Sequence, residues 1–206
     1  MNNVVLVLRK SNKFTERDVE LLAGNIRKRS NSVNIFCLAD VPLNITDVEV
    51  RPMMNDWQGT WSRMELYSPL FYDLRPFLFV DLDTAIFCDL GKIIENIPDK
   101  TKYIPLEDFY QPKQLATGLL WMPKENEDIN KVWIEWLKSK SKEKTLKGRM
   151  DVFLRRHIKE GGFFQNIVEG IYGFKPKKQG WLDKLPEDVK LVCFHGKPTI
   201  WEAAKK

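Results

Sequence analysis

Apolar residues occur along the chain in short runs and helical stripes that predict alternating strands and helices. The runs at 4–8 and 33–38 are aliphatic and β-branched, so both are expected to be buried strands. Between them, 15–29 is expected to be a helix, with Thr15 and Asp18 at the positions of a capping box. Strand, helix and strand at this spacing predict a βαβ unit and a parallel sheet. The apolar stripe of the helix comprises Val19, Leu22, Ala23 and Ile26.

The rest of the pattern predicts further strands and helices in the same layers. The four apolar residues at 77–80, continued by Leu82, are typical of a strand that is buried on both faces. The segment 138–144 is rich in lysine and has no apolar periodicity, so it is expected to be a solvated connection. Strands are also expected at 48–51, 103–106, 119–122 and 190–194, and helices at 62–72, 89–95, 126–137 and 148–159.

Two of these predicted helices have apolar faces that are expected to pack in the core. The face of 62–72 is irregular, whereas 126–137 places two tryptophans and a leucine on one side. The pattern as a whole predicts an α/β fold with one domain at 1–206, in which helices flank a mainly parallel mixed sheet. The two faces comprise Met64, Leu66, Leu70 and Phe71 in the first helix, and Trp133, Trp136 and Leu137 in the second.

Composition supports a globular protein with an anionic partner. Of the 206 residues, 43% are hydrophobic and 30% are charged, which is unlike a disordered chain. The net charge of +5 suits a nucleotide as well as a nucleic acid. Cys37, Cys88 and Cys193 are odd in number and lie in apolar runs, so reduced thiols and a cytoplasmic location are expected. The sequence shows no leader peptide and no run long enough to span a bilayer, so membrane insertion is not expected.

Two carboxylates follow the apolar run at 77–80. On an extended chain Asp81 and Asp83 point to the same side, while Leu82 points back into the protein. Carboxylate oxygens are preferred ligands of Mg²⁺ and Mn²⁺, which proteins often bind together with substrate phosphates. The simpler interpretation of the motif alone is a solvated turn after a strand.

A second group of polar residues follows the predicted strand at 190–194. His195 offers a nitrogen ligand, Gly196 allows close approach of the backbone, and Lys197 offers a charge for a phosphate. A nitrogen ligand favours Mn²⁺ over Mg²⁺. By itself His195 is better interpreted as a histidine with an ordinary hydrogen-bond partner. The two strand ends together predict a site for a metal and a nucleotide diphosphate at one edge of the sheet.

Three segments carry a resemblance to a known family. The sequence at 79–84, together with 61–65 and 194–198, resembles the metal-dependent glycosyltransferases of the GT-A fold. It is similar in particular to retaining enzymes of the glycogenin and bacterial lipopolysaccharide galactosyltransferase type, and small virus-encoded glycosyltransferases that modify capsid proteins are possible closer relatives. The resemblance implies transfer of a sugar from a UDP-sugar to an acceptor hydroxyl, with Mn²⁺ and with retention of the anomeric configuration.

The resemblance also implies roles for individual residues. Asp81-Leu82-Asp83 would bind the metal and the nucleotide ribose, and His195 would complete the metal site. Lys197, next to Gly196, would contact the diphosphate. Two further positions belong to the donor site in the same way. Arg63 would lie near the donor, and the end of the first strand, comprising Leu8, Arg9 and Lys10, would lie near uracil.

Two departures leave the group near the donor sugar unassigned. The chain has Ala116-Thr117-Gly118 where the family commonly has Asn-Ser-Gly, and 148–151 contains no Gly-Asp-Gln. Asp151 is a candidate by proximity, although an acid in the first turn of a helix is also explained by the helix dipole. Glu107 and Asp108, after another predicted strand, are alternatives for contacting the sugar or the acceptor.

Two other functions compete with glycosyl transfer, which would have a glycan or glycoprotein acceptor. The segment 80–84 also resembles haloacid-dehalogenase-type phosphatases, in which Asp81 would be the nucleophile and Asp83 the acid and base. That motif normally lies in the first strand and is followed by a Gly-Asp pair, and this chain contains no Gly-Asp dipeptide. The third hypothesis is a basic binding module, but the basic residues are scattered without aromatic interleaving, so a nucleic-acid partner is not expected.

Overall fold

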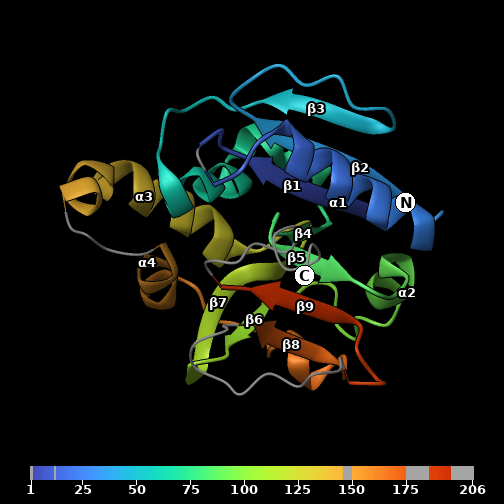
Figure 1. Ribbon diagram of the computed structural model, residues 1–206. Coiled ribbons are helices and arrows are strands. Elements are labelled where there is room, and N and C mark those ends of the chain that lie inside the picture. Colours follow the sequence, from blue (N-terminus) through green and yellow to red (C-terminus); the bar gives the residue numbers. More distant parts are fainter. Residues whose placement is uncertain (1, 12, 146–149, 175–185, 196–206) are drawn as a thin grey trace.

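A six-stranded mixed sheet forms the centre of the molecule in the computed structural model, which describes residues 2–11, 13–145, 150–174 and 186–195 (Figure 1). The strand order is β3-β2-β1-β4-β7-β6. The first four strands of this order are parallel, whereas β7 runs antiparallel to both of its neighbours. The predicted α/β fold with a mainly parallel sheet is therefore confirmed. The strands are β1 (Asn2–Leu8), β2 (Val33–Ala39), β3 (Val48–Pro52), β4 (Phe77–Val80), β6 (Ile104–Asp108) and β7 (Gln111–Met122).

The predicted βαβ unit is present at the N-terminal end of the chain. Helix α1 (Glu16–Arg29) connects β1 to β2 and lies across one face of the sheet (Figure 1). Thr15 precedes the helix, and its backbone N–H donates to the carboxylate of Asp18 at 2.7 Å, which closes the predicted capping box. The four residues of the predicted apolar stripe are all buried. Periodicity and capping therefore located this helix correctly.

The opposite face of the sheet is covered by 3₁₀ helices and by α3 and α4. The single helix predicted at 62–72 is wrong, because the chain forms η1 (Gly59–Tyr67) and η2 (Pro69–Leu74) with an extended residue, Ser68, between them. Proline disfavours helical backbone in the residue before it, which explains the break at Ser68. Leu70, expected on the apolar face, is exposed.

Helix α3 (Glu127–Thr145) is longer than its apolar stripe. It continues through 138–144, so the solvated connection predicted there is wrong. Lysine and glutamate have good helix propensity, and pairs such as Lys138 with Glu135 at 2.8 Å support the helix beyond its apolar stripe. Trp136 is fully buried and stacks on Trp61, whereas Leu137 is exposed, contrary to prediction.

A second, three-stranded sheet carries the chain away from the end of β4. Its order is β5-β9-β8, formed by Thr84–Ile86, Leu191–Phe194 and Ile171–Phe174. Strand β9 was predicted, but β5, which has three residues, and β8, which contains a glycine that disfavours strands, were not. Strand β5 pairs antiparallel with β9, and the small sheet therefore brings the chain after Asp83 beside the chain before His195.

The remaining helices are short, and the thiols are unpaired. Helix α2 (Leu90–Glu95) begins after Asp89, whose carboxylate accepts a hydrogen bond from Gly91, as the pattern predicted. Helix α4 (Met150–His157) follows α3, and η3 (Phe164–Asn166) precedes β8.

All three cysteines are free, as expected. None of the helices in the described part of the chain combines the length and the apolar character needed to cross a bilayer.

Candidate functional site

Asp81, Leu82 and Asp83 form a tight turn between the two sheets. The backbone N–H of Thr84 donates to the carbonyl of Asp81 at 3.1 Å, so the extended geometry expected for this segment is wrong. The chain has to leave β4 here and enter β5, and a turn accomplishes this change of sheet. Asp81 N donates to Gly118 O at 2.9 Å, and Asp83 O accepts from Phe194 N at 2.8 Å. The turn is thus fixed at both ends, and the buried Leu82 side chain points into the core as predicted.

Each carboxylate of the turn has a cationic partner. Arg63 Nη2 lies 2.5 Å from Asp81 Oδ2, and Lys13 Nζ lies 2.7 Å from Asp83 Oδ2. Both aspartates are more than nine-tenths buried, and buried charges require such pairing. Burial is the main reason that the pKa of Asp81 is raised to about 7; the charge of Asp83 adds to the increase, and the Arg63 guanidinium opposes it. Sequence analysis assigned Arg63 to this site but gave no role to Lys13.

Arg63 also connects the turn to helix α4. Its Nη1 donates to Thr117 Oγ1 at 3.1 Å, and the Thr117 hydroxyl donates to Asp151 Oδ1 at 2.6 Å. Thr117 and Asp151 are both buried. A continuous set of polar contacts therefore runs from Asp81 on the turn to Asp151 on α4. Asp151 was predicted by proximity alone, whereas Thr117 was noted only as part of a departure from the family motif and was given no role.

A cavity of about 230 Å³ opens beside this turn, at the carboxyl ends of β1 and β4. Its lining includes the cationic side chains of Arg9, Lys13 and Arg63, together with Asp81. Arg9 is fixed by an ion pair with Asp40 at 3.4 Å and by a hydrogen bond to the carbonyl of Asp56 at 3.1 Å. Three cations around one cavity favour an anionic ligand, and carboxyl ends of parallel strands are the usual place for nucleotides. Leu8, in contrast, is buried in the core and does not line the cavity.

His195 follows β9 and lies next to the acidic turn along the small sheet. Its backbone N–H donates to Phe174 O at 2.9 Å. Its imidazole packs edge-on against the rings of Phe109 and Tyr110, with centroid distances of 5.5 and 5.3 Å. Strand pairing thus brings the backbone just before His195 beside Asp83, and a shared metal site for the two side chains stays a prediction. Gly196 and Lys197, the other predicted residues of this strand end, lie outside the described residues.

Glu107 and Asp108 are the last two residues of β6, at the start of the hairpin to β7. Asp108 Oδ1 accepts hydrogen bonds from the backbone of Tyr110 and Gln111 at 2.9 and 3.2 Å, and Oδ2 pairs with Arg155 at 3.1 Å. Glu107 Oε1 accepts from the backbone N–H of Lys113 at 2.6 Å. Both carboxylates thus hold the backbone of the hairpin. A contact of either one with sugar or acceptor stays a prediction.

The chemistry of the acidic turn fits a hard divalent cation. Asp81 and Asp83 offer buried carboxylate oxygens, and His195 offers nitrogen on the neighbouring strand. In the parts of the chain that the structure describes, no three histidine, cysteine or acidic side chains are already grouped around one point. The carboxylates are paired with Arg63 and Lys13 instead. A divalent cation on this turn would therefore have to share or replace those contacts.

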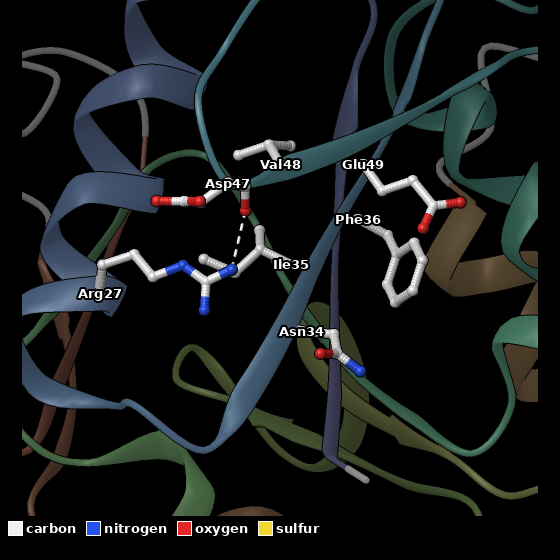
Figure 2. A pocket seen from close by; sticks show the side chains of 7 residues that line it. All are labelled: Arg27, Asn34, Ile35, Phe36, Asp47, Val48 and Glu49. Atoms are coloured by element: carbon white, nitrogen blue, oxygen red, sulfur yellow. Dashed lines mark hydrogen bonds between the residues drawn. The ribbon is translucent and has the colours of Figure 1, made fainter.

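A second depression lies at the amino end of β2 and β3, away from the acidic turn. Its volume is about 470 Å³. Figure 2 shows the Arg27 guanidinium directed at the backbone of Asp47, and the two are hydrogen-bonded at 2.8 Å. Arg27 also donates to Val33 O at 2.7 Å, so it holds the connection between these strands. Ile35 and Phe36, which are neighbours in β2, both line the depression although their side chains point to opposite faces of the sheet. The depression therefore follows a strand edge, and it is a weak candidate for a ligand-binding site.

Solved structures with the same fold are glycosyltransferases. An active-site mutant of LgtC has a TM-score of 0.66 at 12% identity over 97% of this chain and 89% of LgtC. WbbM, described as a bifunctional glycosyltransferase, has a TM-score of 0.65 at 11% identity, and GlyE from Streptococcus pneumoniae TIGR4 has 0.60 at 14%. The match covers 98% of this chain and 50% of WbbM, and 79% of this chain and 44% of GlyE. No family model and no curated protein matches. The chain therefore has the GT-A glycosyltransferase fold that its motifs predicted.

Proposed function

We propose that the protein transfers a sugar from a nucleotide diphosphate sugar, in the first place a UDP-sugar, to a hydroxyl of a glycan or glycoprotein. The observation that carries this proposal is the buried acidic turn at a cavity lined by Arg9, Lys13 and Arg63. The fold supports it, since LgtC, described as a galactosyltransferase, has been solved with donor and acceptor sugar analogs and has a TM-score of 0.63 to this chain. The proposal extends from fold to activity, and it needs a direct test.

The arrangement suggests what each group does. The cations of the cavity would hold the diphosphate and stabilise the negative charge that develops as the bond between sugar and phosphate breaks. Asp81, Asp83 and, by resemblance, His195 would hold Mn²⁺, which supplies further positive charge to the departing diphosphate. Arg63 joins Asp81 to Thr117, so it orients the acidic turn as well as facing the cavity.

Asp151 is our candidate for the group near the donor sugar. Its carboxylate is joined to Arg63 through Thr117, and Arg63 lines the cavity. A carboxylate there would stabilise the positive charge that a sugar ring develops during transfer. The acceptor hydroxyl would form the new bond on the face that the diphosphate leaves, and its proton would pass to the departing phosphate oxygen. This scheme retains the anomeric configuration and needs no covalent enzyme intermediate.

Ligand binding and turnover test the proposal. We expect UDP with Mn²⁺ to raise the melting temperature more than UDP alone, GDP or a single-stranded oligonucleotide, because a ligand of the folded state stabilises it. A panel of UDP-sugars with Mn²⁺ is then expected to release UDP from one of them, and Asp83→Asn to abolish that release. Stabilisation by the oligonucleotide alone would support a binding module. Phosphate release from a generic phosphoester, lost in Asp81→Asn, would support the phosphatase alternative and contradict ours.

A further inference from the structure

Lys13 occupies a position where a metal-dependent site would need an open carboxylate. Its ammonium lies 2.7 Å from Asp83 Oδ2, within hydrogen-bond distance, and 4.3 Å from the centre of the Phe14 ring. The side chain of Asp83 is 8% exposed, and that of Lys13 is 42% exposed. A partly solvated cation is thus bound to a buried anion.

The backbone that carries Lys13 is fixed beside the turn. The hydroxyl of Ser11 accepts hydrogen bonds from the backbone N–H groups of Lys13 and Phe14, each at 3.2 Å. The N–H of Ser11 donates in turn to Phe14 O at 3.0 Å. These contacts hold the backbone of Lys13 at the cavity, from which its side chain reaches Asp83, a residue from a different part of the chain.

The two cations of the acidic turn differ in how firmly they are held. The side chain of Arg63 is 16% exposed, is also bonded to Thr117, and lies 5.9 Å from the centre of the Phe79 ring. Lys13 is more exposed, and lysine carries a compact charge on a flexible stem. Unlike the planar guanidinium of arginine, the ammonium can move without breaking a pair of parallel hydrogen bonds. A ligand that competes for the carboxylates would therefore displace Lys13 before Arg63.

We propose that Lys13 is a built-in counter-cation of Asp83 that a divalent metal ion has to displace. In the metal-free protein the ammonium compensates the buried charge of Asp83. When the metal binds, the ammonium leaves the carboxylate and stays at the rim of the cavity, where Phe14 and the backbone turn keep it. Lys13 thereby weakens metal binding, and it offsets the free-energy cost of the buried Asp83 charge when no metal is bound. The proposal rests on the proposed metal-dependent function of the same turn.

The affinity for Mn²⁺ alone, measured by electron paramagnetic resonance of the free ion, tests this displacement. Lys13→Met is expected to bind Mn²⁺ about tenfold more tightly than the wild type. This factor corresponds to the free energy of one hydrogen bond to a charged group, which the metal no longer has to break. Lys13→Arg keeps the charge and is expected to bind as weakly as the wild type. Lys138→Met is the matched control, because it removes a lysine from an ion pair of similar length, 2.8 Å, on the exposed surface of α3.

Thermal stability gives a second readout that does not depend on enzymatic activity. In EDTA, Lys13→Met is expected to melt below the wild type, because Asp83 then lacks a partner, and saturating Mn²⁺ is expected to remove this difference. If Lys13→Met does not fold, Lys13→Gln offers a neutral donor to Asp83 and tests the same competition. Tightening of equal size in Lys138→Met, or none in Lys13→Met, would overturn the displacement.

The outcomes also separate this inference from the proposed function. Mn²⁺ binding and UDP release without any tightening in Lys13→Met would overturn the role of Lys13 and leave the glycosyltransferase proposal intact. Absence of Mn²⁺ binding by the wild type and by both Lys13 variants, even with UDP present, would overturn both. Tightening in Lys13→Met without UDP release from any donor would support the role of Lys13 and contradict the proposed function.

Discussion

Two pairs of acidic residues follow buried strands in this chain, and the structure uses them differently. Asp81 and Asp83 after β4 are paired with the side chains of Arg63 and Lys13 beside a cavity. Glu107 and Asp108 in β6 accept hydrogen bonds from the backbone of a hairpin. In sequence the two pairs look alike. Asp108 also has a cationic partner, Arg155, but neither Glu107 nor Asp108 lines the cavity. The difference teaches that cationic pairing beside a cavity, and not a place at the end of a strand, separates a candidate binding site from a structural turn.

The hairpin still contributes to the site through its aromatic residues. Asp108 fixes the backbone around Phe109 and Tyr110, whose rings contact the imidazole of His195. Gly173 on β8 makes room for one of them, because a Cβ atom there would lie 2.6 Å from a ring carbon of Phe109. The second acidic pair therefore supports the position of His195 without reaching the acidic turn itself.

The largest effect is expected from the first pair. Asp81→Asn removes the charge that holds Arg63, and turnover of the UDP-sugar is expected to fall by about 10²- to 10³-fold, as when one preorganised electrostatic contact is removed. Steady-state release of UDP measures this. A rate within threefold of the wild type would place the chemistry elsewhere and would end the distinction between the two pairs.

A loss of stability is expected from the second pair. Asp108→Ala removes two backbone hydrogen bonds and the ion pair with Arg155, so the free energy of unfolding is expected to fall by about 2–3 kcal/mol. Urea denaturation measures the change, and Asp108→Asn, which keeps an oxygen for the backbone, serves as the control and is expected to recover part of it. Lost turnover at unchanged stability would instead support a direct role of Asp108 in the reaction.

A smaller effect is expected at Thr117, which joins the first pair to α4. Thr117→Val keeps the β-branched shape but removes the hydroxyl between Arg63 and Asp151, and kcat is expected to fall about tenfold, the value of one hydrogen bond to a charged group. Thr117→Ser restores the hydroxyl and is expected to restore most of the rate. Equal losses in both variants would show that packing at this position matters and the hydroxyl does not.

The smallest effect is expected at Glu107. Glu107→Gln keeps an oxygen that can accept a hydrogen bond from Lys113 N. The free energy of unfolding is therefore expected to stay within about 0.5 kcal/mol of the wild type, and the turnover within about twofold. Melting curves and UDP release measure both quantities. A large drop in turnover would bring Glu107 back as a group that contacts sugar or acceptor.

Local patterns in the sequence predicted the elements whose residues lie close together along the chain. The run of β1, the stripe and cap of α1, and the apolar strand before Asp81 need only neighbouring residues to be recognised. The apolar pattern also predicted the α/β fold, and the family resemblance predicted its GT-A type. Arg63 was placed near the donor by the same resemblance, and the structure pairs it with Asp81.

Features that depend on distant partners could not be predicted in this way. The turn at Asp81 exists because the chain changes sheets, and the second sheet appears only when β5 meets β9. Lys13 lies in a polar loop with no periodicity, so the sequence does not indicate that it pairs with Asp83. The role of Thr117 depends on its hydrogen bonds with Arg63 and Asp151, which lie in two other elements.

The pairing of β5 with β9 also sets the order in which the site can assemble. The carbonyl of Asp83 receives its hydrogen bond from Phe194, near the opposite end of the described chain, and closing so long a loop is slow compared with forming local contacts. During synthesis the six-stranded sheet can form with Asp81, Arg63 and Thr117 in place before β9 leaves the ribosome. The cationic cavity can therefore form before β9 pairs with β5, and His195 can reach its place beside the acidic turn only after that pairing.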